Sequence, residues 1–306
     1  MASVRHSYKE IKNLKSIIPF FLGALLALAP MTARADDAAN PLEDLIKKQA
    51  PSIVTVKAVL KMQMKMSGQS RDTETRMELL GTVVSSDGLI MVSNMPFDTK
   101  SMMQMMGSDS SDFQIKISPT DFKVVIGSEE KQYTGFMAGA DSTVGMAFIK
   151  IEDLGDRTLQ PVEFASADRP AIGDNVYAVG RLSKGYDYAP FLEDAVVVGH
   201  FSKPKEGWVV SGAQDVGVPV FTASGKLLGA STMVASGVSD SGTRSMSVGS
   251  HLQPFLLPAS TFTSVIALAK QQAVTVAAKR AQDKAAKPAT PVTPAAPVAP
   301  ATKPAK

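Results

Sequence analysis

The chain of 306 residues contains no cysteine. Disulfide bonds are therefore excluded, even though an oxidising compartment would permit them. Lipid attachment through a cysteine is excluded too, so the fold must be held together by its apolar core. Aromatic residues make up only 6 % of the chain, and no basic face is interleaved with them. Binding to nucleic acid is therefore not expected.

The N-terminus has the order of segments that is typical of a secretory signal peptide. A basic stretch is followed by the apolar run SIIPFFLGALLALAP and then by Ala33-Arg34-Ala35, a small-x-small cleavage pattern. We predict a cleaved signal over 1–35 and a periplasmic or secreted mature chain. The apolar run is short for a bilayer span, so no stable membrane span is expected after cleavage; a retained anchor is the alternative.

Charge is unevenly distributed along the chain, whose formal net charge is +3. Without residues 1–35 the remainder carries about −1, and its body is more acidic still because basic residues gather at the C-terminal end. Those basic residues are Lys279, Arg280, Lys284, Lys287, Lys303 and Lys306. The last residues are almost entirely Ala, Pro, Lys, Thr and Val, which predicts a disordered tail over 281–306.

The first elements of the mature chain are a helix and a strand. Asn40 suits an N-cap and Pro41 suits the first helical position, which together predict a short helix over 41–49. Residues 52–66 alternate between apolar and polar types and are rich in β-branched side chains, which predicts a strand. The polar stretch 67–75 then predicts a loop.

Strand patterns continue through the rest of the body, about one in every ten residues, with turn residues between them. They include residues 162–164 and 246–249. A final apolar pattern predicts a helix over about 259–280. We therefore expect an all-β fold, a sandwich or barrel, with short helices only at its N-terminal and C-terminal ends.

Four blocks of sequence resemble those of HtrA-type trypsin-like serine proteases, in the family's order. They are GTVVSSDGLIMVSNMPFD at 81–98, GSEEKQYTGFMAGADSTVGMAFIKIE at 127–152, VEFASADRPAIGDNVYAVGRLSKG at 162–185 and AQDVGVPVFTASGKLLG at 213–229. The resemblance implies a trypsin-like (chymotrypsin-fold) double six-stranded antiparallel β-barrel, with an active cleft between the barrels.

The same resemblance sets the expected domain boundaries. The trypsin-like domain is expected over 36–272, with barrel 1 over about 50–153 and barrel 2 over about 160–257. The last helix is followed by the Ala/Pro/Lys-rich tail, where relatives often carry a PDZ domain.

The catalytic positions of the family fall on residues that differ from the triad. Met95 stands in place of the histidine, Gly145 in place of the aspartate and Val216 in place of the nucleophilic serine. Gln214 and Asp215 stand in the loop that forms the oxyanion hole in the family.

Acyl transfer needs a nucleophile, a base within hydrogen-bond reach and a group that orients the base. A thioether, a hydrogen atom and an isopropyl group supply none of these. A carboxylate such as that of Asp215 would also oppose a developing oxyanion. The sequence therefore predicts a catalytically inactive protease homologue, or pseudo-protease, with no cofactor, acting as a protein- or peptide-binding module in the cell envelope.

A residual serine-type endopeptidase with a non-standard site is the alternative. The histidines that follow the predicted signal are His200 and His251. We interpret His200 as structural because it falls in a strand pattern where the family has an apolar residue. A Ser250–His251 dyad is disfavoured, since adjacent residues of a strand point to opposite faces.

Methionines and aromatics offer further candidate sites. Clustered thioethers suit Cu(I) in an exported protein, whereas the plainer interpretation is an adaptable apolar surface or core. The methionines are Met62, Met64, Met66, Met102, Met103, Met105 and Met106. Aromatic side chains anchor peptides at many interfaces, and ordinary barrel core is the alternative for them here. They are Tyr186, Tyr188, Phe191 and Trp208.

Overall fold

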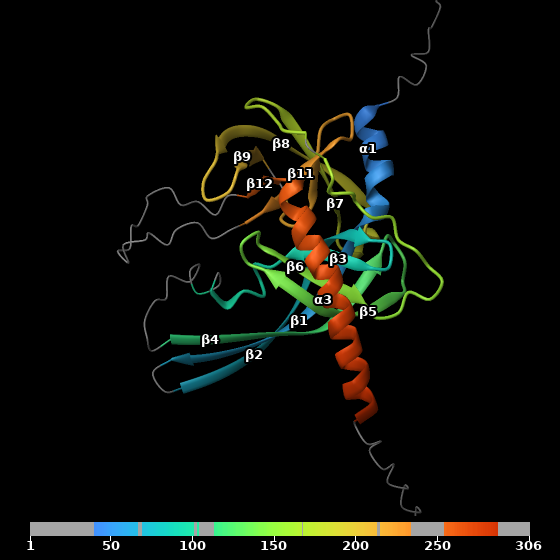
Figure 1. Cartoon of the computed structure of the whole chain (residues 1–306), viewed down its shortest axis with the longest axis vertical. Helices are drawn as coiled ribbons and strands as arrows, with labels where there is room; N and C mark the ends of the chain where they lie inside the picture. Colours follow the sequence, from blue (N-terminus) through green and yellow to red (C-terminus); the bar gives the residue numbers. More distant parts are fainter. Residues whose placement is uncertain are drawn as a thin grey trace, which may run out of the picture. The chain divides into compact units, whose positions relative to one another are not determined.

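Two closed, six-stranded antiparallel β-barrels make up the fold, and a helix precedes and another follows them in sequence (Figure 1). The computed structural model describes residues 40–66, 69–100, 103, 113–166, 168–212, 215–233 and 254–286. The two barrels confirm the predicted all-β, trypsin-like fold class. The predicted signal peptide and the predicted strand 246–249 lie outside the described residues. Within the described ranges, no helix combines the length and apolar character that a bilayer crossing requires.

The first barrel closes in the strand order β1-β2-β3-β6-β5-β4. Its strands are β1 (Ile53–Met66), β2 (Gln69–Ser85), β3 (Leu89–Ser93), β4 (Phe113–Ile126), β5 (Gln132–Asp141) and β6 (Met146–Ile151). Side chains alternate between the two faces of each strand. One face fills the barrel with β-branched residues, among which Val54, Val56, Ile90 and Ile149 are fully buried.

The second barrel closes in the strand order β10-β11-β12-β9-β8-β7. Its strands are β7 (Asn175–Arg181), β8 (Pro190–Phe201), β9 (Gly207–Gly212), β10 (Pro219–Phe221), β11 (Leu227–Thr232) and β12 (Phe255–Pro258). Val176, Val197, Val220 and Leu256 are fully buried in it, and Trp208 packs with them.

A further apolar cluster joins the two barrels. It contains Met146 and Phe148 from the first barrel and Phe221 from the second, with Leu45 from α1 (Pro41–Gln49) and Phe262 from α3 (Ala259–Ala286). Because the buried cluster is continuous, the side chains of one barrel pack directly on those of the other. The two helices cover this shared core rather than the interior of either barrel.

The N-terminal helix α1 begins as the sequence predicts. The Asn40 side chain accepts a hydrogen bond from the Leu42 amide at 3.2 Å, and proline occupies the first turn. This satisfies one of the amides that have no partner inside a helix. A 3-10 turn, η1 (Ala50–Ser52), then leads the chain directly into β1.

Strand β2 corrects the prediction of a loop over 67–75, because the strand begins at Gln69 and pairs with β1 from there. Polar residues suit this strand, since much of it lies outside the barrel and is exposed on its surface. Residues 162–164, predicted as a strand, form none, although the Val162 amide donates to the carbonyl of Val83. The short strand β12 was not predicted from the sequence.

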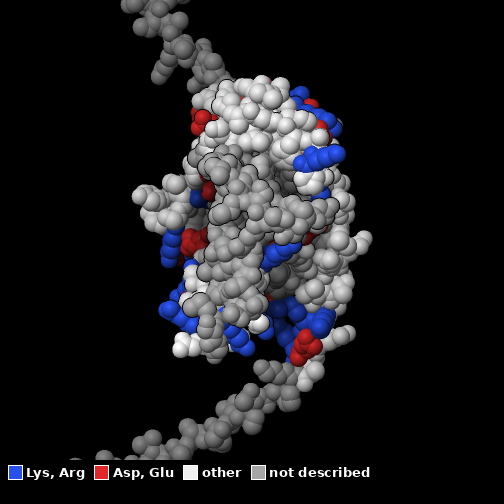
Figure 2. Space-filling view, turned by 90° about the vertical axis from the view of Figure 1, so that its left-hand side faces the viewer, with Lys and Arg blue, Asp and Glu red and all other residues white. Residues whose placement is uncertain are grey.

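Beyond the barrel, β1, β2 and β4 continue together as a three-stranded arm (Figure 1). We define the arm as residues 60–66, 69–76 and 113–120. One face of its central strand carries Met62 and Met64, whereas the other carries Lys61 and Lys65. In Figure 2, Lys and Arg side chains lie beside Asp and Glu side chains in the lower part of the view. Charges along exposed edges disfavour pairing with other sheets.

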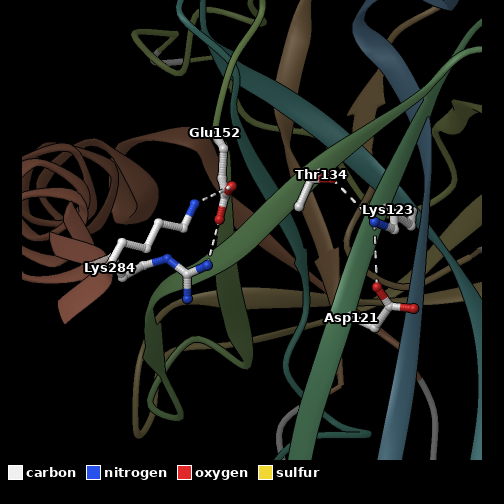
Figure 3. Close-up of polar contacts among 6 residues, drawn as sticks. Asp121, Lys123, Thr134, Glu152 and Lys284 are labelled. Atoms are coloured by element: carbon white, nitrogen blue, oxygen red, sulfur yellow. Dashed lines mark hydrogen bonds and ion pairs between the residues drawn. The ribbon is translucent and has the colours of Figure 1, made fainter. Parts of the chain in front are cut away.

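The C-terminal helix α3 is longer than the predicted 259–280. Residues 281–286, which the sequence analysis assigned to the tail, are helical. Two cations near the end of the helix, Arg280 and Lys284, bind the carboxylate of Glu152 at the end of β6 (Figure 3). These contacts attach the last turns of α3 to the first barrel. The hydrogen bond from Arg280 is the main reason that the pKa of Glu152 lies below its ordinary value.

A second cluster of polar contacts ties two strands of the first barrel together. Lys123 of β4 donates to the hydroxyl of Thr134 on β5 at 3.1 Å and lies 3.4 Å from the Asp121 carboxylate (Figure 3). Both clusters are on the surface, where ion pairs contribute little to stability. The buried cluster between the barrels is therefore the main attachment of α3, and the Glu152 contacts extend it.

Replacing Glu152 tests how much the last turns of α3 depend on these ion pairs. We expect Glu152→Gln to lower the free energy of unfolding by about 1 kcal/mol or less, and the loss to shrink at high salt because exposed charges are screened. Urea denaturation at two salt concentrations measures both. Glu130→Gln is the matched control, since Glu130 is exposed and has no ion pair among the described residues. An equal loss in both variants would contradict the assignment.

Candidate functional site

A cleft of about 340 Å³ lies where the two barrels meet. The first barrel contributes Ser93 and Met95 from the end of β3, and the second contributes Arg181 from the end of β7. Asp215 and Val216 reach it from the loop that precedes β10. The structure thus brings two of the three predicted triad positions, Met95 and Val216, into one cleft.

The third triad position, Gly145, lies directly beside the first. The carbonyl of Gly145 accepts a hydrogen bond at 2.8 Å from the amide of Asn94, the residue before Met95. The Met95 amide in turn donates to the hydroxyl of Ser93 at 3.3 Å. Backbone and side-chain bonds therefore hold the turn after β3 against the loop before β6, which places all three positions in one neighbourhood.

Gly145 has no room for a side chain. Its φ of +68° lies in the left-handed region that favours glycine. A Cβ atom added there would lie 2.6 Å from the Thr232 hydroxyl and 2.9 Å from the Met233 carbonyl oxygen. Thr232 is itself buried and donates to the carbonyl of Val144 at 2.6 Å. The space that a side chain at position 145 would need, where the family has its aspartate, is therefore already occupied by a threonine from the second barrel.

The loop around Val216 is fixed to both barrels. In the second barrel, the Gly217 amide donates to the carbonyl of Ser231 at 2.8 Å. From the first barrel, the Thr82 hydroxyl donates to the carbonyl of Gly217 at 3.1 Å. Gly217 has a φ of +91°, and a Cβ there would lie 2.6 Å from the Ser93 amide. The loop therefore approaches the first barrel closely even though Val216 is no nucleophile. Gln214, the other predicted residue of this loop besides Asp215, lies outside the described residues.

A buried carboxyl group, Glu193 on β8, lies beneath this loop. It is 8 % exposed, and its Oε2 accepts a hydrogen bond from the Asp215 amide at 2.7 Å. Burial, reinforced by the nearby Asp215 carboxylate, raises the pKa of Glu193 to about 7. Glu193 was not among the candidate residues predicted from the sequence. The signal was present, because Ala195 and Val197 alternate toward the core and place Glu193 on the same face.

The guanidinium of Arg181, also missed, is hydrogen-bonded to backbone carbonyls. It donates to the carbonyls of Ala50, Ile53 and Tyr188, the last at 2.9 Å. Burial lowers the pKa of Arg181 relative to its ordinary value. Its partners are 7 to 131 residues away in sequence, so no local pattern identifies it.

The four predicted aromatic binding residues do not form one surface. Tyr186 is 68 % exposed, whereas Tyr188 is buried and lies beneath the Lys57 ammonium at 5.6 Å. Phe191 packs against Gly180, and Trp208 is in the core of the second barrel. None of the four is among the residues that line the cleft. Their binding role stays a prediction.

The remaining candidate residues lie away from the cleft. His200 is exposed, and its Nε2 lies 3.4 Å from a carboxylate oxygen of Glu206; His251 lies outside the described residues. Met62 and Met64 are half-buried on the arm, and Met66 is the last residue of β1. Met103 is half-buried too, whereas the other three methionines lie outside the described part. In that part, no group of three or more His, Asp or Glu side chains is placed to hold a metal ion.

Comparison with known families agrees with the fold. Residues 80–229 match the family model described as "Trypsin-like peptidase domain". This segment includes all three predicted triad positions, Met95, Gly145 and Val216. No curated protein matches the chain. The family match and the two barrels together support a trypsin-like protein of the chymotrypsin fold.

The lack of space at Gly145 predicts a large cost for any side chain there. Gly145→Ala should lose about 2–4 kcal/mol of unfolding free energy, from left-handed strain plus collision with Thr232. Gly155→Ala is the matched control, because Gly155 has a φ of +59° with nothing within 4 Å of the added Cβ. It should lose only about 1 kcal/mol. Chemical denaturation measures both, and equal losses would show that Thr232 does not close the site.

The raised pKa of Glu193 predicts a pH-dependent stability. Its neutral form is favoured in the fold, so the stabilisation is complete below the ordinary carboxyl pKa and is lost as the pH rises through about 7. Glu193→Gln keeps an acceptor for the Asp215 amide, so it should raise the unfolding free energy at pH 8 by about 1–2 kcal/mol. The substitution should also flatten the decline of the unfolding free energy between pH 5 and 8.

Denaturation curves across that pH range measure the effect. The exposed neighbour on the same strand, Asp194, supplies the control: Asp194→Asn should keep the wild-type slope. A wild-type protein whose stability rises from pH 5 to pH 8, or a Glu193→Gln variant with an unchanged slope, would refute the assignment.

Proposed function

We propose that the protein is an exported, catalytically inactive homologue of HtrA-type serine proteases that binds a peptide or protein segment in the cleft between its barrels. The proposal includes a cleaved signal over 1–35 and a C-terminal tail that follows α3. Export is supported by the basic, apolar and small-residue order of the N-terminus.

The closed site at Gly145 is the observation that most strongly supports inactivity. Met95 and Val216 line the cleft without a proton acceptor or a nucleophile, and the place beside Gly145 is filled by Thr232. Loss of a triad nucleophile or base costs about a millionfold in rate in the best-measured serine protease. Here the orienting position is also blocked sterically.

Other groups of the cleft do not replace the triad. Ser93, Thr55 and Ser183 supply hydroxyls to the lining, but none of the described residues that line the cleft is a histidine. A serine hydroxyl is a weak nucleophile unless a base stands within hydrogen-bond reach. His200, the histidine in the described part of the chain, instead lies beside Glu206 on the second barrel.

The cleft nevertheless keeps the features of a binding site. It is concave, it lies between two barrels, and hydrogen bonds from both barrels fix the loop at Gly217. Binding sites in proteins are commonly preformed clefts of about 300–1,000 Å³ with a few fixed polar groups. Packing of the barrels needs neither the imidazole nor the hydroxyl of an active protease, so the cleft persists without them.

Incubation with short fluorescent peptides tests both halves of the proposal. We expect some peptides to raise the fluorescence anisotropy and to be recovered uncut by mass spectrometry, while a fluorophosphonate probe leaves the protein unlabelled. Val216→Trp, which fills the cleft, should abolish binding; an active trypsin-like protease is the positive control for labelling and cutting. Stoichiometric labelling or cleavage that follows the purified protein contradicts inactivity. Peptide binding that Val216→Trp leaves unchanged contradicts the cleft.

A further inference from the structure

The cleft contains a cation without a carboxylate partner. Arg181 lines it and is half-buried, and its three hydrogen bonds go to neutral backbone carbonyls. No carboxylate of the described residues lies within 4.0 Å of the guanidinium, the limit for an ion pair. Three of its five N–H donors are used, which leaves two for another partner.

Burial of a charge is costly unless the charge is paired. The carbonyls around Arg181 satisfy donors and fix the orientation of the guanidinium, but they do not neutralise it. A planar guanidinium that is held in place presents parallel N–H groups that match the two oxygens of a carboxylate. The arrangement therefore favours an anionic, planar partner over a neutral one.

A second polar group in the same cleft lacks a partner within the described part of the chain. Thr55, which lines the cleft, is 4 % exposed, and its Oγ1 has no hydrogen-bond partner among the described residues. A buried hydroxyl without a partner is destabilising, because it has lost its hydrogen bonds to water and gained none in return. Thr55 lies two residues from Ile53, whose carbonyl accepts from Arg181. The two incompletely satisfied donors thus line the same cleft, and the strand that carries Thr55 also supplies a carbonyl to Arg181.

The remaining charged groups of the cleft further define which ligand charges it favours. The Glu78 carboxylate is paired with Lys57 at 2.9 Å. Asp215 is exposed and has no ion pair within the described ranges. Among the described residues, the cleft therefore offers a cation without an ion-pair partner, Arg181, and a carboxylate without a cationic partner, Asp215, whose carboxylate neighbour is the Glu193 carboxyl group. This pair of charges is complementary to a ligand that carries both signs of charge.

The size of the cleft limits how such a ligand is bound. Its volume of about 340 Å³ is at the lower end of the range for ligand pockets. An end of a peptide fits this volume better than a length of chain that continues on both sides. The last residue of a peptide also carries a carboxylate on its main chain, and the side chain of the residue before it lies close to that carboxylate.

Building on the proposed function, we propose that the cleft binds the free C-terminal carboxylate of a peptide at Arg181 and Thr55, with Asp215 favouring a Lys or Arg side chain close to that terminus. The ligand class is thus a basic peptide C-terminus. The ligand carboxylate supplies an anionic partner for Arg181, and the basic side chain supplies a cationic partner for Asp215.

Binding of matched peptides to the full-length protein tests this proposal by fluorescence anisotropy. The probe is an N-terminally labelled peptide with Lys before its last residue, made as the free acid and as the amide. We expect amidation to weaken binding about 10- to 100-fold, since hydrogen bonds to charged groups contribute about 1.5–3 kcal/mol. An amidated peptide with an internal Glu should bind as weakly as the plain amide.

Substitutions in the cleft should reduce the ratio of the affinity for the free-acid peptide to the affinity for the amide. Arg181→Met should bring it close to one, and Thr55→Val should lower it about 3- to 10-fold while leaving the melting temperature unchanged or higher. Ser52→Ala is the control: its hydroxyl is also buried without a partner, but Ser52 does not line the cleft. Asp215→Asn should remove the preference for Lys over Ala before the last residue.

Each outcome decides the question. Equal binding of acid and amide, or tight binding of the amide with the internal Glu, overturns the capture of a C-terminus, whereas peptide binding of any kind would leave the proposed function standing. Arg181 also holds the segment before β1, so melting temperatures are measured with every variant. If Arg181→Met fails to fold, Thr55→Val decides alone, and an unchanged ratio in it overturns the proposal.

Discussion

The apolar cluster shared by the two barrels is the constraint on which the rest of the structure depends. Met146 and Phe148 from one barrel meet Phe221 from the other, and Leu45 and Phe262 from the two helices close the cluster. Protein interiors are packed as densely as organic crystals, so side chains at this junction have little freedom to shift. The cleft is formed at the same junction. Its shape therefore follows from packing, not from a catalytic group.

This explains how the cleft between the barrels exists with Met95 and Val216 in its lining and Gly145 directly beside the turn that carries Met95. The loop before β10 is held by backbone bonds at Gly217, and the turn after β3 by a bond between Asn94 and Gly145. Backbone bonds do not depend on which side chain the residue carries. The triad side chains are thus separable from the fold, and Thr232 now occupies space that an aspartate would require.

Charge at the junction is held by backbone groups. Glu193 accepts from the Asp215 amide, and Arg181 donates to carbonyls of the segment before β1. Both groups are fixed in position by backbone partners; burial favours the neutral form of Glu193, whereas no carboxylate of the described residues pairs with Arg181. In the inactive scaffold that we propose, Arg181 and Asp215, which line the cleft, take the place of the triad as the groups that face a ligand. The arrangement favours recognition of charge over stabilisation of an oxyanion.

Sequence alone determined the features that depend on local pattern. Period-two alternation and turn spacing predict an all-β sandwich or barrel, and the resemblance of the four blocks to HtrA-type proteases implies the two barrels and assigns Met95, Gly145 and Val216 to the triad positions. The same reasoning failed over 67–75, because a strand that pairs outside the barrel needs no apolar face. Only the tertiary structure decided that Thr232 fills the space at Gly145 and that Arg181 has no carboxylate partner among the described residues. Such facts depend on contacts between residues that are distant in sequence, which the folded chain alone brings together.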